Sequence, residues 1–161
     1  LVPHLSTETL EFVSTGLQYT RVEKTRQTVQ IDLSRQYLNV CVSPGPDGRN
    51  CSVCDKCART MVTLELLQSL EKYGRVFDFQ RYRRVRTSYF AFLLVQRKTD
   101  PYAREILAAL HREKRRLPVK SRLLALPFLA LPGRWKKRVY KLLLRLLAAS
   151  GRIPPREGSH A

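Results

Sequence analysis

The feature that most constrains this chain is its set of four cysteines, which all lie between positions 41 and 57. Their spacing is Cys41-x9-Cys51-x2-Cys54-x2-Cys57. A C-x2-C-x2-C turn lets three sulfur atoms converge on one ion, and the loop rich in Pro and Gly before Cys51 can fold the fourth sulfur back. Zinc prefers four thiolates in a tetrahedron at about 2.3 Å, and such a closed site leaves no position for water or substrate. The sequence therefore predicts one structural zinc site, with Cys41, Cys51, Cys54 and Cys57 as ligands.

Other roles for these cysteines remain open at this stage. They could be reduced core residues, or they could hold an iron–sulfur cluster, although no ferredoxin-like Cys-Pro ending is present. Two disulfides or a redox-active pair are further alternatives, but no secretory signal pattern opens the chain and no thioredoxin-like βαβ pattern surrounds the cysteines. We expect a reducing, cytoplasmic setting.

Charge is distributed unevenly along the 161 residues, which carry a formal net charge of +17. Positions 111–161 hold 14 Lys and Arg against Glu113 and Glu157, which gives this tail +12 and leaves +5 for positions 1–110. A basic chain can bind nucleic acid, and a basic, leucine-rich tail can bind an anionic membrane surface. The 43% of apolar residues are enough to build a folded core.

The pattern of residues predicts a mainly helical chain with short strands around the metal site. We expect a first helix over about 21–30, which begins after a T-x-x-E capping box. A second is expected over about 58–73 and ends at a left-handed Gly74. A third begins at Pro101, with Asp100 as its N-cap. Short strands are expected at 10–14 and 37–42, the second delivering Cys41 to the metal. The apolar run 89–95 fits either a strand or a helix. A last amphipathic helix is expected over about 134–149, beyond the breaks at Pro118, Pro127 and Pro132.

The cysteine motif, together with its surroundings, resembles a known family. The order of Cys41, a Gly/Pro loop, C-x2-C-x2-C and then Arg59 resembles the C-terminal zinc motif of the 7-cyano-7-deazaguanine synthases, which are PP-loop ATP pyrophosphatases. The likeness to their uncharacterised bacterial relatives extends over residues 3–82 and includes Leu5–Glu8, Thr20–Thr25, Asn50–Thr60 and Val76–Asp78.

This resemblance implies an α/β fold of the adenine nucleotide alpha hydrolase type, in which the four cysteines hold zinc. It also implies an upstream domain whose Ser-Gly-Gly-x-Asp-Ser loop binds ATP and activates a substrate carboxylate by adenylylation. This loop is not in the chain, so we expect the chain to be the C-terminal part of a longer protein, to need that upstream domain as its partner for ATP, and to lack a catalytic set of its own. Arg21, Glu23 and Lys24 match a family signature and could face the active site or simply cap and cover a helix.

We accordingly divide the chain into the end of the PP-loop-like domain (1–82), a helical extension (83–118) and a basic amphipathic tail (119–161). One alternative function is a zinc-ribbon-like module that binds nucleic acid, for which Arg81–Arg86 would supply cations and a stacking tyrosine. Another is peripheral attachment to the inner membrane through the tail. His4, His111 and His160 lie far from the cysteines in sequence and are expected to be surface residues.

Overall fold

The computed structural model describes residues 8–10, 16, 18–42, 44–45 and 47–129, and within them it contains helices and no strand. The expected strand at 10–14 and the expected helix at 134–149 lie almost wholly or wholly outside these residues. The helices, in chain order, are α1 (Arg21–Thr28), α2 (Ser34–Tyr37), α3 (Asp55–Leu66), the 3-10 helix η2 (Leu70–Tyr73), α4 (Phe79–Gln96), α5 (Pro101–Arg112) and α6 (Val119–Leu129).

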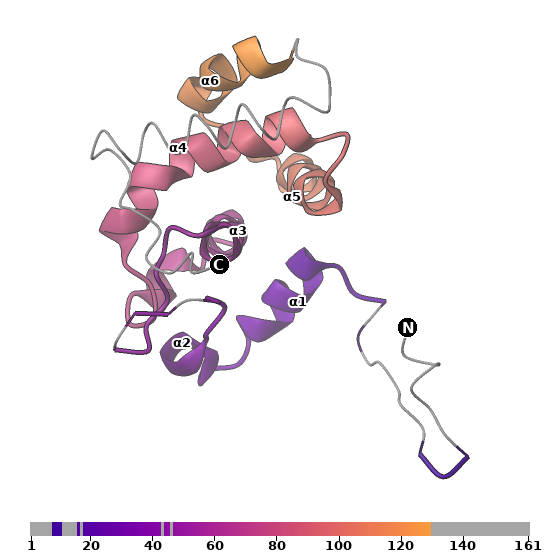
Figure 1. Cartoon of the computed structure of the whole chain (residues 1–161), viewed down its shortest axis with the longest axis vertical. Helices are drawn as coiled ribbons and strands as arrows, with labels where there is room; N and C mark the ends of the chain where they lie inside the picture. The colour runs from indigo at the N-terminus through magenta and orange to yellow at the C-terminus, as the bar shows by residue number, and fades with distance from the viewer. Residues whose placement is uncertain (1–7, 11–15, 17, 43, 46, 130–161) are drawn as a thin grey trace.

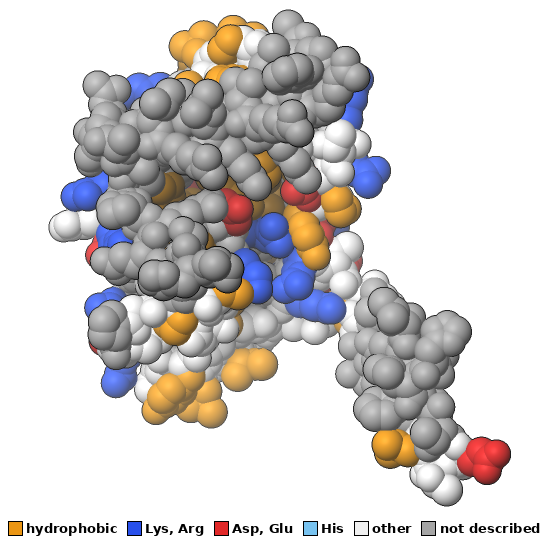
Figure 2. Space-filling model, in the orientation of Figure 1, with side chains coloured by type: hydrophobic (Ala, Val, Ile, Leu, Met, Phe, Trp, Pro, Cys, Tyr) orange, Lys and Arg blue, Asp and Glu red, His pale blue; other side chains and the backbone are white. Residues whose placement is uncertain are grey.

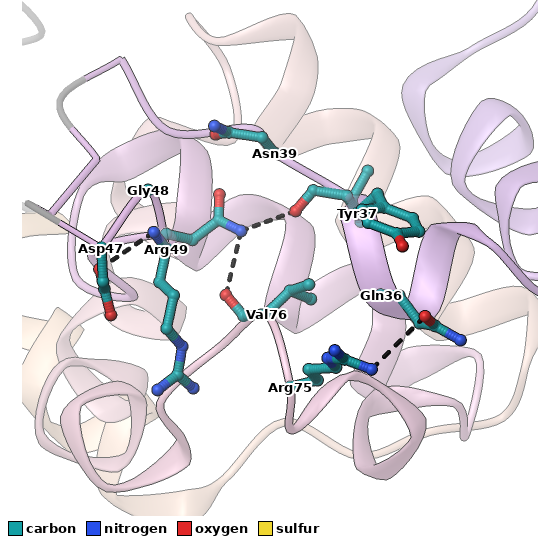
Figure 3. Close-up of a pocket in the computed structure, with 10 residues that line it drawn as sticks. Gln36, Tyr37, Asn39, Asp47, Gly48, Arg49, Arg75 and Val76 are labelled. Carbon is teal, nitrogen blue, oxygen red and sulfur yellow. Dashed lines mark hydrogen bonds between the residues drawn. The ribbon is translucent and has the colours of Figure 1, made fainter.

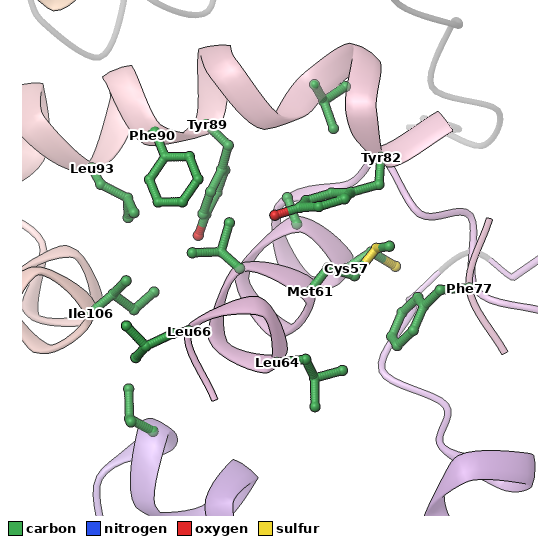
Figure 4. Packing of buried hydrophobic residues seen from close by; sticks show 14 of the residues in the cluster. Cys57, Met61, Leu64, Leu66, Phe77, Tyr82, Tyr89, Phe90, Leu93 and Ile106 are labelled. Carbon is green, nitrogen blue, oxygen red and sulfur yellow. The ribbon is translucent and has the colours of Figure 1, made fainter. Parts of the chain in front are cut away.

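Helix α3 lies at the centre of the fold and contacts α1, α4, α5 and η2 (Figure 1). Helix α4 packs against α3 and α5 on one side and against α6 on another. The main core forms between these helices, and its largest members come from α3, η2, the turn after η2, α4 and α5 (Figure 4). They are Met61, Leu64, Tyr73, Phe77, Tyr82, Tyr89, Phe90, Leu93 and Ile106. Since α3 starts at the third cysteine of the motif, the core is joined directly to the cysteine cluster.

Two helix starts agree with the caps expected from the sequence. Thr20 and Glu23 form the capping box of α1: the Thr20 Oγ1 accepts from the Glu23 N–H, and the Thr20 N–H donates to the Glu23 carboxylate at 2.8 Å. Asp100 caps α5, where its carboxylate accepts from the Tyr102 N–H at 2.8 Å, and Pro101 occupies the first turn. These caps need only neighbouring residues, which is why the sequence alone predicts them.

Helix α3 begins and ends earlier than expected. It ends at Leu66 because Gln68 adopts a left-handed conformation (φ 54°), while the Ser69 N–H donates to the Leu64 carbonyl at 2.9 Å and the Gln68 N–H donates to that of Glu65 at 3.1 Å. This is a Schellman motif, formed here without glycine. Gly74, the expected left-handed stop, has φ −61° and follows the separate 3-10 helix.

The strand expected over 37–42 is not formed, and this prediction was wrong. Tyr37 ends α2, and residues 38–42 have no regular secondary structure. A strand needs a neighbour to satisfy its backbone groups, and the described residues offer none. The N–H groups of Val40 and Cys41 instead donate to the side chain of Asn50, at 2.9 and 3.1 Å. Cys41 thus reaches the cluster on an irregular segment held by a side chain.

The apolar run 89–95 is helical and lies in the C-terminal half of α4. Near the start of α4, Tyr82 is only 2% exposed, and its hydroxyl donates to the Glu65 carboxylate at 2.7 Å. Arg86 donates to the same carboxylate through its Nε, at 2.8 Å, and through one terminal nitrogen. Burial alone would raise the pKa of Glu65, but the hydrogen bonds from Arg86 and Tyr82 outweigh it and hold this pKa below its usual value. The network joins α3 to α4 with a charged pair whose members are both hydrogen-bonded.

The boundary expected between residues 82 and 83 falls inside α4, whose two halves share the main core. The start of the expected tail is also packed on the fold: α6 runs through Pro127 and buries Ala125 against Ala91 and Val95 of α4. None of the helices in the described residues is both long and apolar enough to cross a membrane.

Candidate metal centre

The four cysteines expected as ligands come together at one point. Their Sγ atoms all lie within 4.8 Å of one another. The Cys41 and Cys54 sulfurs are 3.9 Å apart, and those of Cys51 and Cys57 are 3.8 Å apart. A metal ion bound tetrahedrally by four thiolates at about 2.3 Å requires sulfur–sulfur distances of about 3.8 Å. The cluster therefore fits one four-coordinate metal ion.

The turn from Cys51 to Cys57 explains how three ligands can lie so close in sequence. Ser52 takes a left-handed conformation (φ 63°), and the Cys54 N–H then points at the Cys51 sulfur at 3.4 Å. Cys54 is also the N-cap of α3, and its sulfur accepts from the Cys57 N–H at 3.5 Å. The segment from Cys54 to Cys57 is thus the first turn of α3, in which the N-cap residue and the residue three positions later lie close together. Both amide contacts stabilise negative charge on sulfur.

The four thiol groups lie so close together that each changes the pKa of its neighbours. The nearby Cys57 thiol is the largest cause that lowers the pKa of Cys54 to about 5, and the Cys57 backbone N–H, which donates to the Cys54 sulfur, adds to it. The nearby Cys54 thiol, followed by burial, raises the pKa of Cys57, and burial raises that of Cys51. Loss of the first proton, from Cys54, is therefore favoured, whereas loss of further protons from Cys51 and Cys57 is opposed. A divalent cation would remove this opposition, because it offsets two of the four negative charges.

Asn50 holds the irregular segment before Cys41 in place, and the sequence analysis missed this role. Its side chain is buried (6% exposed) and uses both its donor and its acceptor capacity. The amide oxygen accepts from Val40 and Cys41, and the amide nitrogen donates to the carbonyls of Leu38 and Val76 at 2.8 and 3.1 Å. The only sequence signal for this role is an Asn placed directly before Cys51.

Ser52 connects the metal centre to the start of α4. Its hydroxyl donates to the Asn50 carbonyl at 3.2 Å and accepts from the Asp78 N–H at 2.8 Å. Asp78 in turn caps α4 through its carboxylate, which accepts from Gln80 and Arg81. The cluster is therefore tied to α3 by Cys54 and to α4 by Ser52.

The other residues singled out in the sequence lie elsewhere. Glu23 serves the capping box, Lys24 is exposed, and the Arg21 guanidinium lies 5.7 Å from the centre of the Tyr102 ring. Arg59, which the resemblance included, lies over the same ring at 4.0 Å. His111 is an exposed residue of α5, while His4 and His160 are outside the described residues.

The interleaved strip Arg81–Arg86 does not present an aromatic face to a nucleic acid. Tyr82 is a core residue, and Arg86 is paired with Glu65. Arg83 and Arg84 remain exposed on α4. The strip can contribute cations but not a stacking tyrosine, which removes half of the pattern that favoured nucleic-acid binding.

Comparison with known proteins finds no matching protein family, no matching curated protein and no matching solved structure. The functional assignment therefore rests on the geometry of the chain and on its residue pattern, and its firmest part is a four-cysteine cluster that can hold a metal ion.

Proposed function

We propose that this chain is the zinc-stabilised C-terminal portion of an ATP-pyrophosphatase-like enzyme, similar to the 7-cyano-7-deazaguanine synthases, and that an upstream α/β domain supplies the ATP-binding loop. The observation that carries the zinc assignment is the tetrahedral sulfur spacing at Cys41, Cys51, Cys54 and Cys57. A closed set of four thiolates suits zinc in a structural role. The order of motifs around it supports the enzyme family.

In this proposal the zinc holds the ends of the 42–50 loop together and joins them to α3, and it takes no part in the chemistry. The thiolates must stay reduced, which favours a cytoplasmic location. Formation of an adenylylated intermediate from ATP would be the task of the upstream domain, since no glycine-rich loop opens a helix in the residues that the structure describes.

Pyrophosphate release tests the enzyme proposal. The chain alone, loaded with zinc, is expected to release no pyrophosphate from ATP, because oriented donors around the triphosphate are missing. The same chain expressed together with the coding sequence that precedes it is expected to release pyrophosphate when a carboxylate substrate is supplied. Release by the chain alone, or an upstream segment that contains no Ser-Gly-Gly-x-Asp-Ser loop, would contradict the proposal.

A second candidate function is attachment to an anionic membrane surface, and α6 favours it. One face of α6 packs on α4, while Val119, Leu123 and Leu126 on the opposite side are 69%, 61% and 58% exposed. Figure 2 shows hydrophobic side chains at the surface over α6, at the top of the view. Their spacing places them on one face of the helix, and the exposed Lys120 and Arg122 lie between the two faces. An outward apolar stripe bordered by cations suits the boundary between headgroups and acyl chains of an anionic bilayer.

Vesicle co-sedimentation tests this attachment. In about 0.1 M salt, where electrostatic attraction still acts over about 10 Å, the chain is expected to bind vesicles of phosphatidylcholine with phosphatidylglycerol several-fold better than vesicles of phosphatidylcholine alone. The Leu123→Ser/Leu126→Ser variant is expected to bind the anionic vesicles several-fold less than the wild type. The control Ile31→Ser/Leu33→Ser removes two exposed apolar side chains elsewhere and is expected to bind as the wild type does. Equal binding of the wild type and the α6 variant would show that α6 does not enter the surface.

A further inference from the structure

A cavity of about 530 Å³ lies beside the metal loop, between the end of α2, the 47–50 segment and the turn after η2 (Figure 3). Its volume is in the range of small-ligand sites. The residues that the argument uses are Gln36, Tyr37, Asp47, Arg49, Arg75 and Val76. The cavity is separate from the sulfur cluster, because no cysteine lines it.

Two guanidinium groups line this cavity, and neither has a carboxylate partner within 4.0 Å among the described residues. Arg49 donates to the Gly74 carbonyl at 3.3 Å, and Arg75 donates to the Gln36 side chain at 3.4 Å. Each guanidinium has five N–H donors, so most of them remain for a ligand. The one carboxylate in the lining, that of Asp47, accepts from the Arg49 backbone N–H. The cavity is therefore net positive and rich in donors, which suits a phosphate group.

Tyr37 adds an aromatic surface to the same cavity. It is 72% exposed although it belongs to a helix, and it lines the cavity together with Val76 and the amide of Gln36. An exposed tyrosine beside two arginines provides a stacking surface for a planar base next to an anion site. Tyr37 ends α2 and does not belong to the strand expected over 37–42, so its place in the cavity emerges only from the tertiary structure.

The walls of the cavity are held rigidly by Asn50. Its single side chain bonds the carbonyl groups of Leu38 and Val76, two residues that line the cavity from different segments of the chain, and it also bonds Val40 and Cys41. Since Cys41 and Cys51 flank this arrangement as candidate metal ligands, the shape of the cavity depends on the metal centre. A site that is formed before its ligand arrives loses less entropy on binding.

We propose that this cavity binds a nucleoside monophosphate, with Arg49 and Arg75 on the phosphate and Tyr37 against the base, and that the binding requires the metal-loaded loop. The proposal does not depend on an upstream ATP-binding domain, because every residue in it belongs to this chain. A monophosphate site of this kind is also distinct from a catalytic triphosphate site.

Calorimetric titration of the full, zinc-loaded chain with the four ribonucleoside 5′-monophosphates tests the proposal. At least one of them is expected to bind about tenfold or more tightly than orthophosphate or the matching nucleoside, because phosphate and base are each recognised. The Arg49→Gln/Arg75→Gln variant is expected to lose binding about tenfold or more. Its control is Arg83→Gln/Arg84→Gln, which removes the same charge from an exposed part of α4 and is expected to bind as the wild type does.

Two further measurements separate the parts of the proposal. Tyr37→Ala changes an exposed side chain, so it is expected to fold normally and to lower the affinity for the nucleotide to that for ribose 5-phosphate. Removal of zinc by a chelator is expected to abolish binding, and zinc addition to restore it. The proposal is overturned if no monophosphate binds at millimolar concentration, if both arginine pairs weaken binding equally, or if the metal-free chain binds as well as the zinc-loaded one.

Discussion

Replacement of Cys41 by Ser is expected to reduce bound zinc from one ion per chain to less than about a tenth of that, and to unfold the 42–50 loop. Cys41 is the one candidate ligand outside the Cys51–Cys57 turn, so without its sulfur the metal no longer links the start of the loop to α3, and the Asn50 hydrogen bonds are left to hold it. The binding free energy of structural zinc, about 10–16 kcal/mol in small peptides, becomes folding free energy where the metal fixes the chain. Metal analysis after dialysis and amide hydrogen exchange of α3 would measure the two effects.

Two neighbouring variants make this test specific. Val42→Ser alters an exposed side chain (67%) next to the ligand and is expected to keep one zinc per chain. Cys41→His is expected to recover part of the zinc binding, since imidazole is an accepted zinc ligand. Full zinc content in the Cys41→Ser protein, or cysteines that are isolated as disulfides without zinc, would refute the four-ligand assignment.

Replacement of Asn50 by Leu is expected to lower the free energy of unfolding by about 3–5 kcal/mol even in excess zinc. The substitution keeps a side chain of similar size but removes four hydrogen bonds. The Val40 N–H and the carbonyls of Leu38 and Val76 would then lose this partner in a partly or fully buried place, and each such loss costs about 1–3 kcal/mol, less where water can enter. The Cys41 N–H would keep its second acceptor, the side chain of Asn39. Urea denaturation, followed by circular dichroism, would measure the change.

Asn39→Ala serves as the matched control for Asn50. The Asn39 side chain is exposed and accepts a single hydrogen bond, from the Cys41 N–H at 3.1 Å. Its loss is expected to change the free energy of unfolding by less than about 1 kcal/mol, because water can replace the acceptor. A loss for Asn50→Leu as small as that for Asn39→Ala would show that the loop is held by the metal alone.

Sequence reasoning succeeded where the interactions are local. The caps at Thr20 and Asp100 depend on residues at most three positions apart, and so does the turn from Cys51 to Cys57. Such contacts form in any chain that carries the pattern, because the connecting backbone is too short to allow many alternatives. The approach of Cys41 was also expected, since the sulfur chemistry demanded a fourth ligand.

The remaining features depended on contacts that no local pattern reveals. Residues 37–42 have the composition of a strand, yet no neighbouring strand is present in the described residues, and Asn50 satisfies their backbone instead. Tyr82 lies in a stretch rich in arginine that suggested an exposed strip, but the core between α3 and α4 buries it. The composition of a segment indicates which structures it can adopt, whereas the burial of its side chains depends on which helices pack against it.

The sequence by itself predicted that the four cysteines form one cluster, that helix caps form at Thr20 and Asp100, and where α1, α3 and α5 lie, because each follows from chemistry or from spacing within a few residues. Only the tertiary structure decided how Asn50 joins two walls, where Tyr37 points, and which face of α6 stays exposed. These features arise from segments that are distant in the chain and meet only on folding. The physical reason is that a buried polar group or an apolar face takes its partner from whatever the packing brings near it.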